Sequence, residues 1–223
     1  MQTKDVNTLR VVVLISGSGS NLQALIDGVA AGELPIEISA VISNRPDVLG
    51  LSRAANAGIP TLVLDHKGFG SREAFDQELM RAIDTYNPGL VVLAGFMRIL
   101  TPEFTQHYLG RMLNIHPSLL PKFQGLHTHQ RAIDAGETQH GVTVHFVTAE
   151  LDGGPAVIQA VVPVLENDDA NLLAKRVQRQ EHVIYPLAVK WFAQGDLVMS
   201  EGKAMLKGET LPACGYQIKA NEP

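Results

Sequence analysis

The segment Arg10-Val11-Val12-Val13-Leu14-Ile15-Ser16-Gly17-Ser18-Gly19-Ser20-Asn21 decides the fold of this chain. Residues 10–15 form an almost continuous β-branched run, which is typical of a strand buried on both faces of a sheet. The glycine-rich turn after it leads into residues 21–31, a predicted helix whose apolar face comprises Leu22, Leu25, Ile26 and Val29. A buried strand, a tight turn and a helix form the opening unit of a parallel α/β sheet.

The same alternation continues along the chain and defines the fold class. Further buried strands are predicted at residues 36–42, 61–64, 90–94 and 112–116, and helices at 49–57 and after Ser71, a predicted N-cap residue. Residues 142–146 and 157–164 predict a hairpin-like extension of the sheet, followed by a long helix at 169–192. The sequence therefore predicts an α/β fold with a single doubly wound, mostly parallel sheet flanked by helices.

Length and composition narrow the class of protein. A length of 223 residues predicts one domain, residues 1–223, with a short N-terminal extension at 1–9 and a loose polar tail at 213–223. The net charge of -5 argues against a nucleic-acid partner, and no apolar run approaches the roughly 18 residues that span a membrane. The single cysteine and the polar N-terminus, which lacks the apolar core of a signal peptide, predict a cytoplasmic protein. Its oligomeric state is left open.

The turn at residues 16–21 is a candidate phosphate site, because ligands of open α/β sheets bind at the carboxyl ends of the strands. Backbone N–H groups at a helix N-terminus, approached through glycines, bind phosphate well. A dinucleotide fingerprint is excluded because Leu22 stands where its third glycine is required, and no Gly-Lys-Ser/Thr follows for a nucleoside triphosphate. The turn predicts a site for a small phosphate ester; the alternative is a plain tight turn in which Ser20 or Asn21 caps the helix.

Two other segments follow strands at the same edge. Residues 95–100 indicate, on their own, only a strand that leads into a helix after Thr101 and Pro102. Asn114 and His116 lie two residues apart on a predicted strand, so their side chains point the same way. An amide that stabilises an oxyanion beside an imidazole that moves a proton suits acyl transfer. The alternative is a structural Asn and His beside a proline-rich loop.

The carboxylates of Asp152 and Glu181 lie in two different sequence contexts. Asp152 lies in the turn Asp152-Gly153-Gly154-Pro155, where aspartate is common for local reasons alone. Glu181 lies within the apolar stripe of the long helix, four residues after Val177 and three before Ile184. An inward carboxylate needs a ligand or a partner such as an Arg or Lys side chain.

Metal and serine chemistry are not expected. His127 and His129 are the histidines closest together, but neither thiolates nor a His-Glu-x-x-His motif supports a zinc site. No serine is flanked by glycines two positions away on both sides, so the nucleophile elbow of the serine hydrolases is absent.

The segment Asn114-Ile115-His116-Pro117-Ser118-Leu119-Leu120-Pro121 resembles a motif of the folate-dependent formyltransferases. The resemblance runs on through Gly125-Leu126-His127-Thr128-His129 to Leu151-Asp152-Gly153-Gly154-Pro155. Together with Gly17-Ser18-Gly19-Ser20-Asn21-Leu22, it is similar to the phosphoribosylglycinamide formyltransferase family over residues 10–212. This resemblance implies a Rossmann-like fold of the formyltransferase type. It also implies transfer of a formyl group from 10-formyltetrahydrofolate to the amine of glycinamide ribonucleotide during purine synthesis.

The resemblance also implies roles for individual residues. Asn114 and a protonated His116 would stabilise a tetrahedral oxyanion, while Asp152 would keep His116 charged and help to move the proton. His127 would hold Asp152 in place. The nucleotide-binding residues would be Gly19, Ser20 and Asn21 for the phosphate, with Gln178 and Glu181 for the ribose side.

The folate-binding residues implied by the resemblance are Arg72, Met97, Arg98, Ile99, Leu100, Asn114, Thr148, Ala149, Glu150, Leu151 and Asp152. This changes the local interpretation of residues 95–100 from a plain connection to part of a pocket. The partners would be small molecules, with 10-formyltetrahydrofolate as co-substrate and no metal, nucleic acid or membrane.

Three alternative functions remain open. A formyltetrahydrofolate hydrolase would use water in place of the amine, but such proteins usually carry an N-terminal regulatory domain, for which little chain precedes Arg10. An initiator-tRNA formyltransferase would need a nucleic-acid-binding domain, and residues 201–223 hold three lysines against three glutamates. A non-enzymatic nucleotide-binding module would not need Asn114, His116 and Asp152 together.

Overall fold

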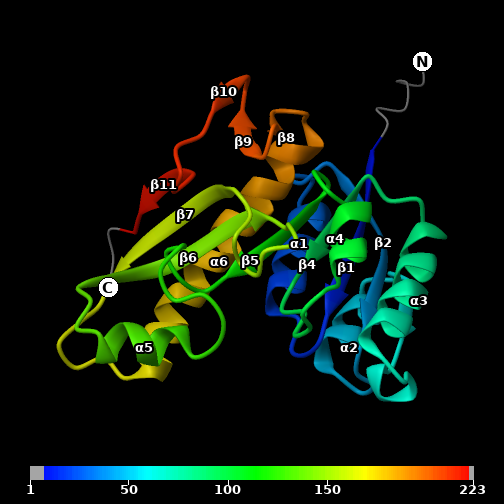
Figure 1. The fold of residues 1–223 in the computed structure, drawn as a ribbon, viewed down its shortest axis with the longest axis horizontal. Helices are drawn as coiled ribbons and strands as arrows, with labels where there is room; N and C mark the ends of the chain where they lie inside the picture. Colours follow the sequence, from blue (N-terminus) through cyan, green and yellow to red (C-terminus); the bar gives the residue numbers. More distant parts are fainter. Residues whose placement is uncertain (1–7, 221–223) are drawn as a thin grey trace.

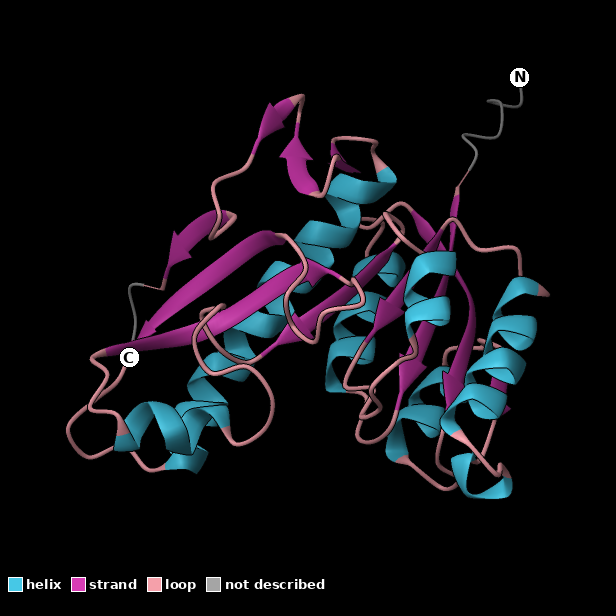
Figure 2. Ribbon diagram, viewed as in Figure 1, coloured by secondary structure: helices cyan, strands magenta, loops and turns pink. Residues whose placement is uncertain are grey.

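The computed structural model describes residues 8–220, so most of the predicted N-terminal extension and residues 221–223 lie outside the described part of the chain. An eight-stranded sheet runs through the molecule with helices on both faces (Figures 1 and 2). Its strands are β1 (Leu9–Ile15), β2 (Ile36–Ser43), β3 (Thr61–Val63), β4 (Leu90–Leu93), β5 (Met112–His116), β6 (Gln139–Phe146), β7 (Ala156–Pro163) and β11 (Tyr216–Lys219).

The strand order is β11-β7-β6-β5-β4-β1-β2-β3. The strands from β3 to β5 pair in parallel, β6 is antiparallel to both β5 and β7, and β11 is parallel to β7. The sheet is therefore mostly parallel with an antiparallel extension, which confirms the predicted fold class and the predicted hairpin of β6 and β7.

The helices cover the two faces of the sheet and bury two separate apolar clusters. They are α1 (Ser20–Ala30), α2 (Leu49–Asn56), α3 (Arg72–Asp84), α4 (Pro102–His107), α5 (Thr128–Asp134) and α6 (Ala170–Ala193), with a short 3-10 helix η1 (His66–Gly68). The larger cluster includes side chains of α1, α2 and α6, and the smaller one includes side chains of α3 and α4. Val13 points into the larger cluster and Leu14 into the smaller, so β1 is buried on both faces as its sequence predicts.

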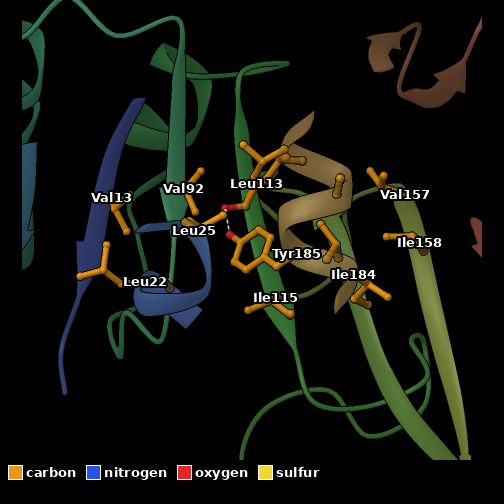
Figure 3. Close-up of a cluster of buried hydrophobic side chains, with 14 of the residues drawn as sticks. Val13, Leu22, Leu25, Val92, Leu113, Ile115, Val157, Ile158, Ile184 and Tyr185 are labelled. Atoms are coloured by element: carbon orange, nitrogen blue, oxygen red, sulfur yellow. Dashed lines mark hydrogen bonds between the residues drawn. The ribbon is translucent and has the colours of Figure 1, made fainter. Parts of the chain in front are cut away.

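Tyr185 of α6 lies at the centre of the larger cluster (Figure 3). Its buried hydroxyl lies 2.7 Å from the carbonyl oxygen of Leu93 and 3.0 Å from that of Leu113. A buried hydroxyl needs such partners. They attach the middle of α6 to the ends of β4 and β5 and so fix where the side chains of α6 stand relative to those strands.

The strand order reverses between β1 and β4, since the chain goes from β1 to β2 on one side and later returns to β4 on the other. Open α/β sheets bind their ligands at such a switch point, beyond the carboxyl ends of the strands. Leu14 pairs with Leu93, and Leu93 pairs with Asn114, so the ends of β1, β4 and β5 lie side by side. The three candidate segments predicted from the sequence therefore meet at one edge.

The prediction of a loose tail at residues 213–223 is wrong for its central part. Residues 216–219 form β11 and pair with β7 at the edge of the sheet. Gly215 allows this approach, because it has a φ of 71° and a Cβ there would lie 2.6 Å from the Val157 carbonyl carbon. The Tyr216 ring also packs edge-on against Trp191, with 5.7 Å between ring centroids. These contacts come from residues far away in the sequence, which local polarity does not reveal.

The sequence also did not predict the small antiparallel sheet that precedes this tail. It consists of β8 (Leu197–Ser200), β9 (Lys203–Leu206) and β10 (Glu209–Thr210). Within residues 8–220, no helix is both long enough and apolar enough to cross a membrane.

Candidate active site

The glycine turn after β1 leaves the start of α1 without a side-chain cap. Gly19 occupies the N-cap position, and neither Ser20 nor Asn21 caps the helix. Gly19 has a φ of 71°, and a Cβ there would lie 2.6 Å from the Cα atom of Gly50, so only glycine fits. The first N–H groups of α1 are therefore available to a ligand, as the phosphate interpretation requires and the plain-turn alternative does not.

Side chains of α6 reach the beginning of α1. The Asn21 amide donates to Glu181 Oε2 at 2.9 Å, and the Gln178 amide donates to the Ser20 hydroxyl at 3.2 Å. Glu181 thus has an amide as its partner rather than the Arg or Lys considered from the sequence. Burial raises the pKa of the Glu181 carboxyl, and the hydrogen bond from Asn21 opposes that shift. Asn21 Oδ1 is buried and has no hydrogen-bond partner among the described residues, which leaves an acceptor beside the turn.

Asn114, His116 and Asp152 come together at the ends of β5 and β6. Asn114 and His116 lie on β5, and Asp152 lies in the connection between β6 and β7. His116 Nδ1 is 3.6 Å from Asp152 Oδ2, and the two side chains are only 8% and 9% exposed. The Gly125 N–H donates to the same carboxylate oxygen at 2.9 Å, and His116 Nε2 donates to the Phe123 carbonyl oxygen at 2.9 Å. The structure therefore places an amide, an imidazole and a carboxylate within one small cluster.

The predicted contact between His127 and Asp152 is wrong. His127 is exposed at the N-cap of α5, with a φ of 58°, and it makes no hydrogen bond or ion pair with Asp152 in the described part of the chain. The backbone N–H of Gly125 holds Asp152 in its place. Every residue except proline carries a backbone N–H, so the residue types alone do not indicate that Gly125 is the donor to Asp152.

His129 pairs with His140 of β6 and not with His127, with 3.2 Å between His129 Nδ1 and His140 Nε2. Burial lowers the pKa of His140 to about 4, and the nearby His129 and His116 act in the same direction. Within residues 8–220, no three His, Cys, Asp or Glu side chains are grouped to hold a metal ion.

His145 is a site residue that sequence reasoning missed. It lies directly opposite Asn114 in the antiparallel pair of β5 and β6, and its Nε2 is 3.2 Å from Asn114 Nδ2. Its Nδ1 is 3.0 Å from the Phe146 carbonyl oxygen, and burial lowers its pKa to about 4. A neutral imidazole has one donor and one acceptor. The Phe146 carbonyl takes the donor, so Nε2 accepts from Asn114 and orients its amide. The sequence feature that could have indicated this role is a histidine, His145, within a strand of mostly apolar residues.

Apart from Asn114 on β5, the predicted folate-binding residues lie on two connections at the same edge and on α3. Met97 and Ile99 follow β4 and are 59% and 56% exposed, although both are large apolar side chains. Arg98 lies between them with its guanidinium carbon 4.5 Å from the centre of the Phe75 ring, and Arg72 begins α3. Leu151, 51% exposed, precedes Asp152 in the connection after β6. Exposed apolar side chains beside arginines suit a flat ring system that carries an anionic tail.

The fold and this cluster define the class of the protein: an α/β group-transfer enzyme with its site at the switch point of a mostly parallel sheet. The family model for formyl transferase matches residues 9–189. Phosphoribosylglycinamide formyltransferase of Escherichia coli is 56% identical over 208 residues, which cover 93% of this chain and 98% of that protein. The Haemophilus influenzae protein of the same name is 48% identical, with coverage of 96% and 99%.

A solved structure agrees with these sequence relatives. Phosphoribosylglycinamide formyltransferase from Coxiella burnetii superimposes with a TM-score of 0.91 at 51% identity, over 95% of this chain and 99% of that chain. The chain belongs to the formyl transferase family, and within it to the phosphoribosylglycinamide formyltransferases. The hydrolase alternative is not favoured, because these nearly full-length relatives are all transferases.

Proposed function

We propose that this enzyme transfers the formyl group of 10-formyltetrahydrofolate to the amine of glycinamide ribonucleotide. The observation that carries the proposal is the cluster of Asn114, His116 and Asp152, with 3.6 Å between His116 Nδ1 and Asp152 Oδ2, beside an uncapped helix start. The nearly full-length relatives that carry this name support it.

The chemistry assigned to the cluster is acyl transfer. The amine of the nucleotide attacks the formyl carbon, and the carbonyl oxygen becomes an oxyanion. Asn114 donates to that oxygen from the amide N–H that His145 does not occupy. The two ring nitrogens of His116 face Asp152 and the Phe123 carbonyl, so a protonated His116 stabilises the oxyanion through its positive charge. Asp152 stabilises the charged imidazole and takes part in moving the proton from the attacking nitrogen to the departing N10 of tetrahydrofolate.

The binding roles divide between the two sides of the switch point. The N–H groups of Gly19, Ser20 and Asn21 hold the phosphate, and Gln178 and Glu181 of α6 face the ribose. The folate lies against residues 97–100, with Arg72 and residues 148–152 at its border. A cytoplasmic location is part of the proposal, supported by a single cysteine that forms no disulfide.

The experiment that tests this function is a formyl-transfer assay that follows folate absorbance with and without glycinamide ribonucleotide. We expect slow formyl release in water alone and strong acceleration by the nucleotide, because a bound amine has an effective concentration that water does not match. The dephosphorylated riboside should bind much more weakly than the nucleotide in calorimetry. Rapid formate release that the nucleotide does not change would contradict the proposal.

A further inference from the structure

The folate-facing segment after β4 is held at both ends by side chains from other elements. At its beginning, the Met97 N–H donates to the Ser16 hydroxyl at 2.8 Å, and Ser16 in turn donates to Asn44 Oδ1 at 2.5 Å. At its end, the Thr101 N–H donates to Asp76 Oδ2 at 2.7 Å. Residues 98–100 lie between these two fixed points.

Asp76 is an unusual residue for the middle of a helix that faces the core. Its neighbours Phe75 and Leu79 belong to the apolar cluster under α3, and Asp76 itself is 0% exposed. Burial raises the pKa of its carboxyl, while hydrogen bonding from the backbone and side chain of Thr101 and the charges of Arg98 and Arg72 oppose that shift. A buried carboxylate is costly unless it is hydrogen-bonded and paired. Thr101 satisfies only one of its two oxygens.

A second observation concerns the other carboxylate oxygen of Asp76 and the side chain of Arg98. Asp76 Oδ1 and Arg98 Nε are both buried, and neither has a hydrogen-bond partner among residues 8–220. One is an acceptor and the other a donor. Arg98 stacks on Phe75, the residue before Asp76, with 4.5 Å between the guanidinium carbon and the ring centre. Arg72 is four residues before Asp76 and therefore on the same side of α3.

The charges also fit a ligand with an acidic end. Asp76 lies near the guanidinium groups of Arg98 and Arg72, and Arg72 also pairs with Glu73 at 4.0 Å. The Arg98 Nε has no hydrogen-bond partner among residues 8–220, which leaves a cationic donor for an acidic ligand. A folate ends in a glutamate, whose carboxylates match arginine well.

We propose that Asp76 is a positioning residue for folate binding: it fixes the end of segment 97–101 and holds Arg98 and Arg72 where they meet the glutamate of the folate. This inference rests on the proposed function, because it takes the co-substrate to be a folate. Asp76 touches no reacting atom and acts only through the segment and the arginines.

The test is Asp76→Asn, which keeps an acceptor for the Thr101 N–H but removes the charge. We expect the KM for 10-formyltetrahydrofolate to rise about tenfold or more, because the neutral amide no longer attracts the guanidinium groups of Arg98 and Arg72. We expect kcat and the KM for glycinamide ribonucleotide to stay within about twofold, because neither the reacting atoms nor the phosphate turn contacts Asp76. The matched control is Asp84→Asn, since Asp84 also lies on α3 and accepts from the Tyr108 hydroxyl at 2.8 Å. It should leave the folate KM unchanged.

A second measurement separates positioning from a purely structural role. Calorimetry would compare 10-formyl-5,8-dideazafolate with the same compound lacking its glutamate. Asp76→Asn should weaken binding of the first by about tenfold or more and leave the second nearly unchanged. Equal losses for both compounds, or no loss for either, would overturn the proposal for Asp76. If the wild-type enzyme neither binds the analogue nor transfers a formyl group, the proposed function itself fails, which is a distinguishable result.

Should Asp76→Asn not fold, Thr101 offers a matched pair of variants. Thr101 has φ -70° and ψ 156°, values that proline adopts, and its hydroxyl caps α4 by accepting from the Phe104 N–H. Thr101→Ala removes the hydroxyl, which caps α4 and also interacts with Asp76, whereas Thr101→Pro removes in addition the N–H that Asp76 binds. A higher folate KM for Thr101→Pro than for Thr101→Ala supports the proposal, and equal values overturn it.

Discussion

Replacement of His145 by phenylalanine should lower turnover about fivefold and leave both Michaelis constants unchanged. His145 Nδ1 donates to the Phe146 carbonyl oxygen at 3.0 Å, so Nε2 accepts from the Asn114 amide at 3.2 Å. Burial lowers the pKa of His145 to about 4, so the ring stays neutral at pH 7 and this pattern of donor and acceptor persists. Phenylalanine fills a similar volume but accepts no hydrogen bond from Asn114.

The expected fivefold fall in turnover follows from the hydrogen bond that Asn114 loses when His145 is replaced. A neutral hydrogen bond contributes about 0.5–1.5 kcal/mol, and 1 kcal/mol corresponds to about fivefold in the population of one amide orientation. The amide then spends less time with its free N–H directed at the oxyanion. Complete removal of that donor by Asn114→Ala should lower kcat far more, by about 100–1,000-fold. His145→Gln should retain most turnover, because its amide oxygen can replace Nε2 as acceptor.

The assay is steady-state formyl transfer by the single variants and by the double variant His145→Phe/Asn114→Ala. If His145 acts only through Asn114, adding His145→Phe to Asn114→Ala should change kcat by less than about twofold. Urea unfolding would report the stability lost when the Phe146 carbonyl loses its donor, about 1–3 kcal/mol. An equal fall in kcat in both backgrounds would refute the assigned role of His145.

Three further outcomes are expected. Asp152→Asn should keep the fold but lower kcat by about 100-fold or more, and near-normal turnover at neutral pH would remove Asp152 from the mechanism. Glu181→Ala should weaken nucleotide binding in calorimetry by about tenfold or more without changing folate binding, and equal effects on both would argue against a ribose contact. The free energy of unfolding should fall between pH 6.5 and about 4, where unfolded histidines take up protons that buried His145 and His140 do not. The loss is about 3 kcal/mol per residue, and urea unfolding that is flat across this range would contradict it.

Several parts of the site could be predicted because their signal is local. The turn at Gly17–Asn21 needs glycine and offers N–H groups whatever surrounds it, so its residues alone indicate a phosphate site. Asn114 and His116 share one strand, and their common direction follows from the two-residue period. Glu181 stood out because a carboxylate interrupts an apolar stripe. Asp76 gives the same signal between Phe75 and Leu79, but its partner Thr101 lies 25 positions further along the chain.

Other parts depend on which distant residues become neighbours. The 3.6 Å separation of His116 and Asp152 exists because β5, β6 and β7 pair in one register, which brings the turn after β6 to the end of β5. The same register places His145 opposite Asn114. The expected contact of His127 was wrong because Gly125, two residues earlier, supplies a backbone donor to Asp152 instead.

The sequence by itself determined the strands from β1 to β7, most of the helices, their α/β order and the glycine turn proposed to bind a phosphate, because burial and helical periodicity are properties of short segments. The tertiary structure alone decided that residues 216–219 join the sheet beside β7 and that Asp76 accepts a hydrogen bond from Thr101 at the end of segment 97–101. It also decided that the Asn114 amide takes its orientation from His145. These contacts join residues separated by 25 to 58 positions, and hydrogen bonds across such distances depend on packing and register that no local pattern contains.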